Sequence, residues 1–117
     1  MKLIFKNPKI HKKDCLKFLK TLDTNSVKLI ITSPPYNIGK EYEKKKSLND
    51  YIKDQEKVLE ECKRVLKKNG SICWQIGTFI KKNYEIVPLD IPIYNICNRL
   101  GLKLRNRVIW HFEHGLH

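Results

Sequence analysis

The hydrophobic residues of this chain fall into short apolar runs separated by longer amphipathic segments. Residues 27–32 and 71–76 are apolar runs rich in β-branched side chains, and each predicts a buried strand. Between them, apolar residues recur at helical spacing, which predicts a long helix capped by Asn49 or Asp50 and ended by Gly70. A strand, a helix and a strand in this order form a βαβ unit, so we expect parallel strands and a right-handed connection.

Weaker patterns flank this unit on both sides. Residues 3–5 predict a short strand, and residues 14–22 predict a helix that begins at an aspartate suited to an N-cap. Residues 89–100 predict another helix, which Gly101 ends. Residues 102–112 alternate basic and apolar side chains, as a strand does. The order of elements predicts an α/β fold with a parallel sheet.

Composition narrows the class of protein. The 117 residues allow one domain at most, and 41% hydrophobic with 31% charged residues is typical of a globular chain. The net charge of +12, from 24 Lys and Arg against 12 Asp and Glu, favours a polyanionic partner. Lysines scattered for solubility would give the same excess, so charge alone leaves both interpretations open.

Cysteine usage and the absence of long apolar runs indicate a compartment. The four cysteines are widely spaced without a C-x-x-C pair, which favours buried, reduced thiols. The first residues have too few consecutive apolar side chains for a signal peptide, and no run approaches the ~18 residues of a membrane span. We therefore expect a cytoplasmic protein with no membrane partner.

The segment that follows the first predicted strand carries the chemistry. Its sequence is Thr-Ser-Pro-Pro-Tyr-Asn-Ile-Gly over residues 32–39. Pro34 and Pro35 have no N–H to donate, so the strand must stop pairing there and enter a stiff, non-helical turn. Bare carbonyls, the Ser33 hydroxyl and the flat ring of Tyr36 can then hold a planar heterocycle by its amino group. A purely structural turn is the other interpretation of two prolines after a strand.

Residues 32–36 match the (S/T/N/D)-P-P-(Y/F/W) motif of the DNA amino-methyltransferases, which methylate adenine at N-6 or cytosine at N-4. The longer string TSPPYNIGKEYE, with residues 23–31 before it, resembles the β-class members of restriction–modification systems. The resemblance implies an α/β fold with a doubly wound, Rossmann-like methyltransferase sheet, of which this chain holds a part. It also implies S-adenosylmethionine as cofactor and double-stranded DNA as partner.

The resemblance further implies roles for the motif residues Ser33, Pro34, Pro35 and Tyr36. Ser33 and the Pro34 carbonyl accept hydrogen bonds from the target amine, and Tyr36 stacks on a base flipped out of the duplex. Transfer is then a direct displacement on the sulfonium methyl, without a covalent enzyme intermediate. Adenine N-6 is favoured over cytosine N-4, because TSPPYNIGKEYE looks more like the adenine-specific members.

A second match lies in the tail. Residues 105–115 resemble the segment that ends the catalytic half of the same enzymes, which makes Trp110, His111 and Phe112 candidates for the target-base pocket. A core position is the alternative for Trp110. Arg105 and Arg107 would face one side of a strand, where they can meet phosphate.

Other candidates follow from position. Parallel strands place their ligands beyond their carboxyl ends, so Asn37 after the motif and Phe79 after Gly77 are candidates for the same cleft. Asn37 can instead cap its own backbone, and Phe79 lies nearer the cleft mouth. Trp74, in the middle of its strand, is expected in the core. The histidines at 111, 114 and 117 are poorly spaced for a metal site, so we expect no metal.

The sequence contains only part of the expected enzyme. The five glycines include no G-x-G pair, so the glycine-rich F-x-G-x-G cofactor motif of the β class is absent, as is a target-recognition region. We therefore expect residues 1–117 to be the catalytic half of a methyltransferase domain, inactive alone, whose cofactor-binding residues lie elsewhere. Its expected partners are therefore a complementing C-terminal half, which would complete it, or further copies of the chain through self-association.

Two alternatives stay open from the sequence. A catalytically silent basic domain, either a DNA-binding remnant or a subunit of a split enzyme, differs from the first interpretation in not needing S-adenosylmethionine. Methylation of RNA is the other, although Ser33 counts against it because the related RNA and protein enzymes usually begin this motif with asparagine. The DNA sequence recognised cannot be read from these residues.

Overall fold

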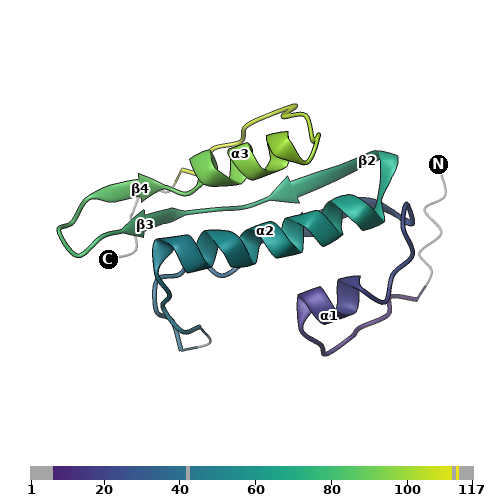
Figure 1. The fold of residues 1–117 in the computed structure, drawn as a ribbon, viewed down its shortest axis with the longest axis horizontal. Helices are drawn as coiled ribbons and strands as arrows, with labels where there is room; N and C mark the ends of the chain where they lie inside the picture. The colour runs from purple at the N-terminus through teal and green to yellow at the C-terminus, as the bar shows by residue number, and fades with distance from the viewer. Residues whose placement is uncertain (1–6, 42, 112, 114–117) are drawn as a thin grey trace.

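The computed structural model describes residues 7–41, 43–111 and 113 and forms an elongated α/β unit of 50 × 31 × 30 Å (Figure 1). Its elements follow in the order α1 (Cys15–Leu19), β1 (Val27–Thr32), α2 (Leu48–Val65), β2 (Leu66–Trp74), β3 (Thr78–Ile80), β4 (Ile86–Pro88) and α3 (Asp90–Arg99). The strand predicted over residues 3–5 lies outside the described residues.

The βαβ unit is present as predicted, but its second strand, β2, runs over Leu66–Trp74 and not over the predicted residues 71–76. Strand β1 has the predicted bounds and pairs in parallel with β2, with Ile30 opposite Ile72 and Thr32 opposite Trp74. The register shifts between Val27 and Leu29, because β2 uses more residues than β1 over the same length at its start. The carboxyl ends of the two strands are therefore in regular register, and that is the end that carries the motif.

The predicted end of the long helix at Gly70 is wrong. Helix α2 stops at Val65, and Gly70 lies within β2 rather than in a left-handed helix cap. Glycine is required at position 70 because β1 lies close to it: a Cβ there would lie 2.9 Å from the Lys28 carbonyl oxygen and 2.8 Å from Leu66 Cδ1. A glycine that lets two strands approach and a glycine that ends a helix look the same in a sequence.

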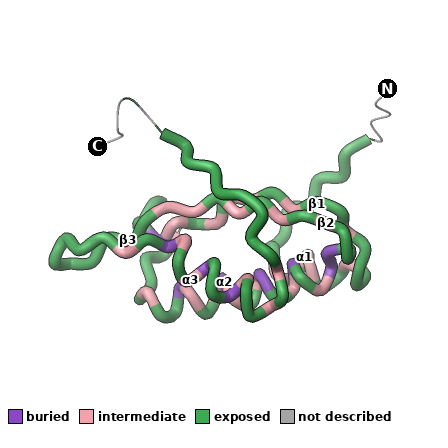
Figure 2. Tube along the Cα trace, turned by 90° about the horizontal axis from the view of Figure 1, so that it is seen from above, coloured by how far each residue is buried: buried purple, intermediate pink, exposed green. Residues whose placement is uncertain are grey.

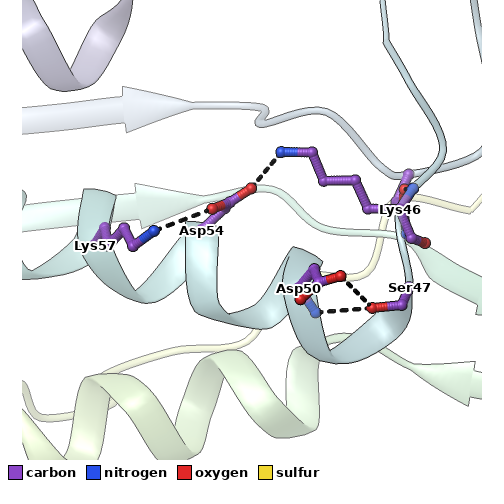
Figure 3. Close-up of polar contacts among 6 residues, drawn as sticks. Lys46, Ser47, Asp50, Asp54 and Lys57 are labelled. Atoms are coloured by element: carbon purple, nitrogen blue, oxygen red, sulfur yellow. Dashed lines mark hydrogen bonds and ion pairs between the residues drawn. The ribbon is translucent and has the colours of Figure 1, made fainter.

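The start of α2 also differs from the prediction. Its N-cap is Ser47, whose hydroxyl accepts from the Asp50 backbone N–H at 3.1 Å and donates to the Asp50 carboxylate at 2.8 Å (Figure 3). Neither Asn49 nor Asp50 is the cap. Serine followed three residues later by an acidic side chain satisfies exposed helix N–H groups and places negative charge at the helix start.

Helix α1 begins as predicted, with the Asp14 side chain accepting from the Lys17 N–H at 3.0 Å, but it ends at Leu19. The segment after it is held by Arg64 of α2. The Arg64 guanidinium donates to the carbonyl oxygens of Leu19 and Leu22, at 2.9 and 3.0 Å. This anchors α1 and the following turn to the last turn of α2.

The core lies on one face of the sheet. Leu59 of α2 and Ile93 and Ile96 of α3 are buried together, and half-buried side chains pack against them: Ile52, Ile72, Trp74, Ile76, Cys97 and Leu100. Figure 2 shows the helices on one side of β1 and β2. The core position of Trp74 and the inward face of α3 are therefore confirmed.

The opposite face and one edge of the sheet are uncovered by the described residues. Leu29 and Ile31 of β1 are 55% and 71% exposed, and Cys73 beside them is exposed too. Within the described chain, β1 pairs only with β2, so its other edge has no partner strand. A doubly wound sheet has helices on both faces, whereas the described helices cover only one face of this sheet.

The cysteines are free, but not all are buried. Cys62 is buried and Cys97 half-buried, whereas Cys15 and Cys73 are exposed. Burial raises the pKa of the Cys62 thiol to about 11, so it stays protonated and unreactive at neutral pH. The expectation of buried thiols therefore holds only for the two that face the core.

The hairpin of β3 and β4 was not predicted. These strands pair antiparallel, with Phe79 opposite Val87, and project beyond α2 and α3 (Figure 1). The strand expected over 102–112 is wrong: residues 102–111 form neither helix nor strand, and Phe112 lies outside the described residues. Val108 and Ile109 are 86% and 85% exposed, because no described strand lies beside them to pair with.

No helix in the described part of the chain is long and apolar enough to cross a membrane.

Replacing Gly70 by Ala should destabilise the chain by about 1–3 kcal/mol, the usual cost of forcing extra volume into a packed position. The reason is the contact with the Lys28 carbonyl, which is backbone and cannot rotate away. Urea unfolding measures the change, with Asn69→Ala, at an exposed neighbour on β2, as control. Equal stabilities for the two variants would show that the close approach is not a constraint.

Candidate active site

The motif turn, defined here as residues 32–36, begins at the carboxyl end of β1. The Thr32 carbonyl accepts from the Gln75 N–H at 2.9 Å, which extends the pairing with β2 by one residue. Beyond it, the Tyr36 ring lies against Gly77, where an added Cβ would be 3.7 Å from Tyr36 Cγ. The structure thus brings the ends of both parallel strands to one place, as the sequence led us to expect.

Ser33 is exposed and oriented by a residue that the sequence analysis missed. Its hydroxyl donates to Gln75 Oε1 at 2.9 Å. With its single proton committed to Gln75, the Ser33 oxygen has lone pairs left with which to accept from another group. Gln75 directly follows β2. A polar residue at the end of the strand that pairs with β1 is the feature of the sequence from which this contact could have been predicted.

Tyr51 braces the prolines from α2. Its hydroxyl donates to the Pro35 carbonyl oxygen at 2.8 Å, and the side chain is only 5% exposed. Burial, followed by the charges of Glu43 and Tyr36, raises the pKa of Tyr51 to about 12, so this phenol is a neutral donor at any physiological pH. Among the described residues none donates to the Pro34 carbonyl, which remains an available acceptor.

Asn37 fixes the loop that follows. It has a left-handed backbone, with φ of 60°, and is 2% exposed. Its side-chain amide donates to the Lys46 carbonyl at 2.9 Å and accepts from the Lys46 N–H at 2.7 Å. These bonds use the side chain within the protein, but on the backbone of Lys46 nine residues along the chain and not on its own backbone.

Glu43 closes the same loop. Its carboxylate accepts from the backbone N–H groups of Asn37, Ile38, Gly39 and Lys40, at 2.8–3.4 Å. Burial acts to raise the pKa of Glu43, but these N–H groups outweigh it and hold the pKa below its ordinary value. The loop is therefore ordered by an ionised carboxylate at neutral pH.

An ion-pair chain ties the loop to α2. The Lys46 ammonium pairs with the Asp54 carboxylate, which also pairs with Lys57 one turn along the helix at 3.5 Å (Figure 3). Behind the motif turn, Asp54 and Tyr51 line a small hollow of about 250 Å³ together with Pro35, Asn37, Glu43, Lys44, Lys46 and Gln55. The turn, the loop and the first half of α2 thus form one connected polar unit.

The other predicted site residues belong to β3 and to the segment that follows α3. Phe79 is half-buried in β3, with the Lys45 ammonium 5.5 Å from its ring centre. Trp110 is 68% exposed and so lies outside the core that the described residues form, and His111 beside it is exposed. Phe112 lies outside the described residues.

The arginines proposed for phosphate differ from each other. Both are exposed, but Arg107 forms an ion pair at 2.6 Å with Asp90 at the start of α3, and no ion pair of Arg105 is seen among the described residues. In the segments that the structure describes, no three His, Cys, Asp or Glu side chains are grouped to hold a metal ion.

Comparison with known proteins gives one family. Residues 27–117 match the family model described as DNA methylase. The chain is 44% identical to Type II methyltransferase M.BglII of Bacillus subtilis over 109 residues and 36% identical to M.HpaI of Haemophilus parainfluenzae over 107. It is also 33% identical to the DNA adenine methyltransferase YhdJ of Escherichia coli K12. These alignments cover 93%, 88% and 86% of this chain, but only 30%, 31% and 32% of the relatives.

Solved structures agree with the sequence relatives. TTHA0409 of Thermus thermophilus, described as a DNA modification methylase, superposes with a TM-score of 0.70 at 27% identity, over 89% of this chain and 44% of that one. The same protein complexed with S-adenosyl-L-methionine superposes with a TM-score of 0.61 at 26% identity, over 75% of this chain and 38% of that one.

Replacing Tyr51 by Phe should destabilise the chain by about 1 kcal/mol at pH 7, the usual net contribution of one hydrogen bond, because it removes the donor to the Pro35 carbonyl. The pKa of Tyr51 rises from about 10 in the unfolded chain to about 12 in the folded one. Its contribution is therefore complete below pH 10 and is lost as the pH rises through 12.

Urea unfolding at pH 7 and at pH 11 measures this, with Tyr94→Phe on the exposed face of α3 as control. The difference between wild type and the Tyr51 variant should shrink at the higher pH. A Tyr51 variant as stable as the control variant at pH 7 would contradict the bracing role.

Proposed function

The chain belongs to the DNA methylase family, and we propose that it forms the base-binding half of an enzyme that methylates an exocyclic amine in double-stranded DNA. One observation carries this proposal: two acceptors, the Ser33 hydroxyl and the Pro34 carbonyl, are held at the carboxyl end of β1 and left available. Such acceptors fit the two N–H groups of an amino-substituted base. The ring of Tyr36 beside them offers a stacking surface.

The proposed chemistry depends on how Ser33 and the Pro34 carbonyl orient the target amine. Gln75 occupies the Ser33 proton, so Ser33 accepts one amine N–H while the Pro34 carbonyl accepts the other. An amine held by both protons directs its nitrogen lone pair away from them, towards a methyl donor. S-adenosylmethionine, when bound, supplies an electrophilic methyl group on a sulfonium centre. Most of the rate then comes from positioning by a turn that is braced beforehand.

The described residues do not make a complete site for that cofactor. None of the five glycines lies in a G-x-G pair. The edge of β1 that faces away from β2 has no partner among the described strands. The relatives are about three times as long as the aligned segment. We therefore propose that a further segment, in the same or another chain, covers this edge and holds the cofactor.

Adenine N-6 is the proposed target atom. The string TSPPYNIGKEYE and the likeness to a DNA adenine methyltransferase support adenine over cytosine N-4. Both amines present two N–H groups, so the paired acceptors serve either base. The choice between them therefore depends on the surrounding pocket.

The second candidate is a catalytically silent basic domain that binds DNA or assembles with a partner. The net charge of +12 and the incomplete cofactor site favour it. Affinity for S-adenosylmethionine after completion of the sheet separates the two proposals, since a silent domain has no need of the cofactor.

A chimera in which this chain replaces the matching segment of M.BglII should methylate DNA. In it, Ser33→Ala should lower kcat by about 100-fold with little change in DNA affinity, because the bond acts mainly in the transition state. Transfer of a labelled methyl group measures the rate, with Asn95→Ala, at an exposed position on α3, as control. Full turnover by the Ser33 variant would remove the amine-orienting role.

The 117 residues alone should bind S-adenosylmethionine weakly and transfer no methyl group, because the edge and face around Ile31 stay open. Exposed strand edges pair with other chains, so self-association is expected as well. Calorimetric titration with the cofactor and light scattering measure the two properties. Micromolar binding by a monodisperse monomer would show that the site needs no further segment.

A further inference from the structure

A second hollow lies between the loop after the motif turn and the β3–β4 hairpin. Its volume is about 630 Å³, and we refer to it as the lysine hollow. The residues that line it are Lys45, Lys46, Ser47, Phe79, Ile80, Lys81, Lys82 and Tyr84. Four of these eight are lysines and none is acidic.

The charges of the lysine hollow are only half compensated. Lys46 pairs with Asp54, and Lys81 pairs with Glu85 at 2.8 Å. Lys45 and Lys82 form no ion pair with any described carboxylate. Ammonium groups gathered around one depression repel one another unless a polyanion lies between them, so the hollow fits a chain of phosphates.

Tyr84, at the tip of the hairpin, is a second and independent observation. Its backbone is left-handed, with φ of 64°, and its side chain is 88% exposed. Glycine or asparagine is the usual residue in that conformation, and a bulky side chain there is strained. The ring gains no burial in return, so folding does not account for a tyrosine at this position. An exposed aromatic face beside lysines is the combination that stacks on a nucleic-acid base.

The lysine hollow is fixed relative to the motif turn. The Lys46 backbone is bonded in both directions to Asn37, next to the turn. Phe79 follows two residues after Gly77, on which the Tyr36 ring lies. The hairpin itself projects from the end of the molecule at which the strands finish (Figures 1 and 2). A strand of DNA that delivers a base to Tyr36 would therefore pass this surface.

We propose that the lysine hollow binds the sugar–phosphate backbone of the target DNA beside the flipped base, through Lys45 and Lys82, and that Tyr84 stacks on a neighbouring base. This rests on the proposed function and adds a DNA contact to it. It adds Lys45 and Lys82 to Arg105 and Arg107 as candidate phosphate contacts.

The test compares two double variants of equal net charge. One is Lys45→Ala with Lys82→Ala, and the control is Lys67→Ala with Lys68→Ala, at the start of β2 and far from the hairpin (Figure 1). Fluorescence anisotropy of a labelled mixed-sequence duplex gives Kd at several salt concentrations. The hollow variant should bind at least tenfold more weakly at low salt. Its slope of log Kd against log salt should fall by about two, one for each lost phosphate contact.

Tyr84→Gly supplies a variant whose folding is not at risk, because glycine adopts the left-handed conformation without strain. It should be as stable as wild type in urea unfolding and bind the duplex more weakly, by about 5-fold or more, the lower end of the effect of losing one base–aromatic stack. Unchanged affinity in this variant would remove the stacking contact.

The remaining outcomes separate this inference from the proposed function. Equal loss in both lysine variants, or no duplex binding by the wild-type chain at low salt, would overturn the lysine hollow as a DNA site. Tighter binding of an RNA duplex of the same sequence would also overturn it. In the M.BglII chimera, the hollow variant should raise the KM for DNA and leave kcat unchanged. An inactive unsubstituted chimera would instead count against the proposed function.

Discussion

The backbone of the motif turn cannot stabilise itself, and the rest of the site follows from this constraint. Pro34 and Pro35 have no N–H groups, so the turn has no donors of its own at its centre. It is held instead by the Tyr51 hydroxyl from α2 and by Gln75 at the end of β2. Because these braces occupy the Pro35 carbonyl and the proton of Ser33, the acceptors that remain are the ones that suit an amine.

The same helix that braces the turn also orders the loop beside it. The loop that precedes α2 is closed by hydrogen bonds of Asn37 and Glu43. Asp54 of α2 pairs with Lys46 at the end of this loop. The braced turn and the lysine hollow are therefore joined by hydrogen bonds and an ion pair at one end of the molecule. The opposite sheet face, with Ile31 exposed, has no such support from the residues that the structure describes.

The spacing of apolar residues along the sequence predicted the elements that depend on that spacing alone. The apolar run before the motif, the parallel pairing and the short helices were found, because alternation and spacing encode them. The end of α2 was wrong because Gly70 serves a close strand contact rather than a helix cap, and the strand over 102–112 lacks a described partner. The bond between Tyr51 and Pro35 joins residues 16 apart, and helical spacing marks Tyr51 only as inward-facing. The hairpin was missed because Tyr84 takes a backbone conformation usually reserved for glycine or asparagine.

The central claim is that the braced turn binds the amine of the target base, and a crystal structure of the M.BglII chimera with its DNA tests it most directly. The deciding quantities are the distances from the target amine nitrogen to the Pro34 carbonyl oxygen and to Ser33 Oγ. We expect both to be about 2.7–3.2 Å, the normal range for hydrogen bonds to oxygen, with the base ring lying on Tyr36. A flipped base whose amine is bonded elsewhere, with the Pro34 carbonyl facing solvent, would contradict the account.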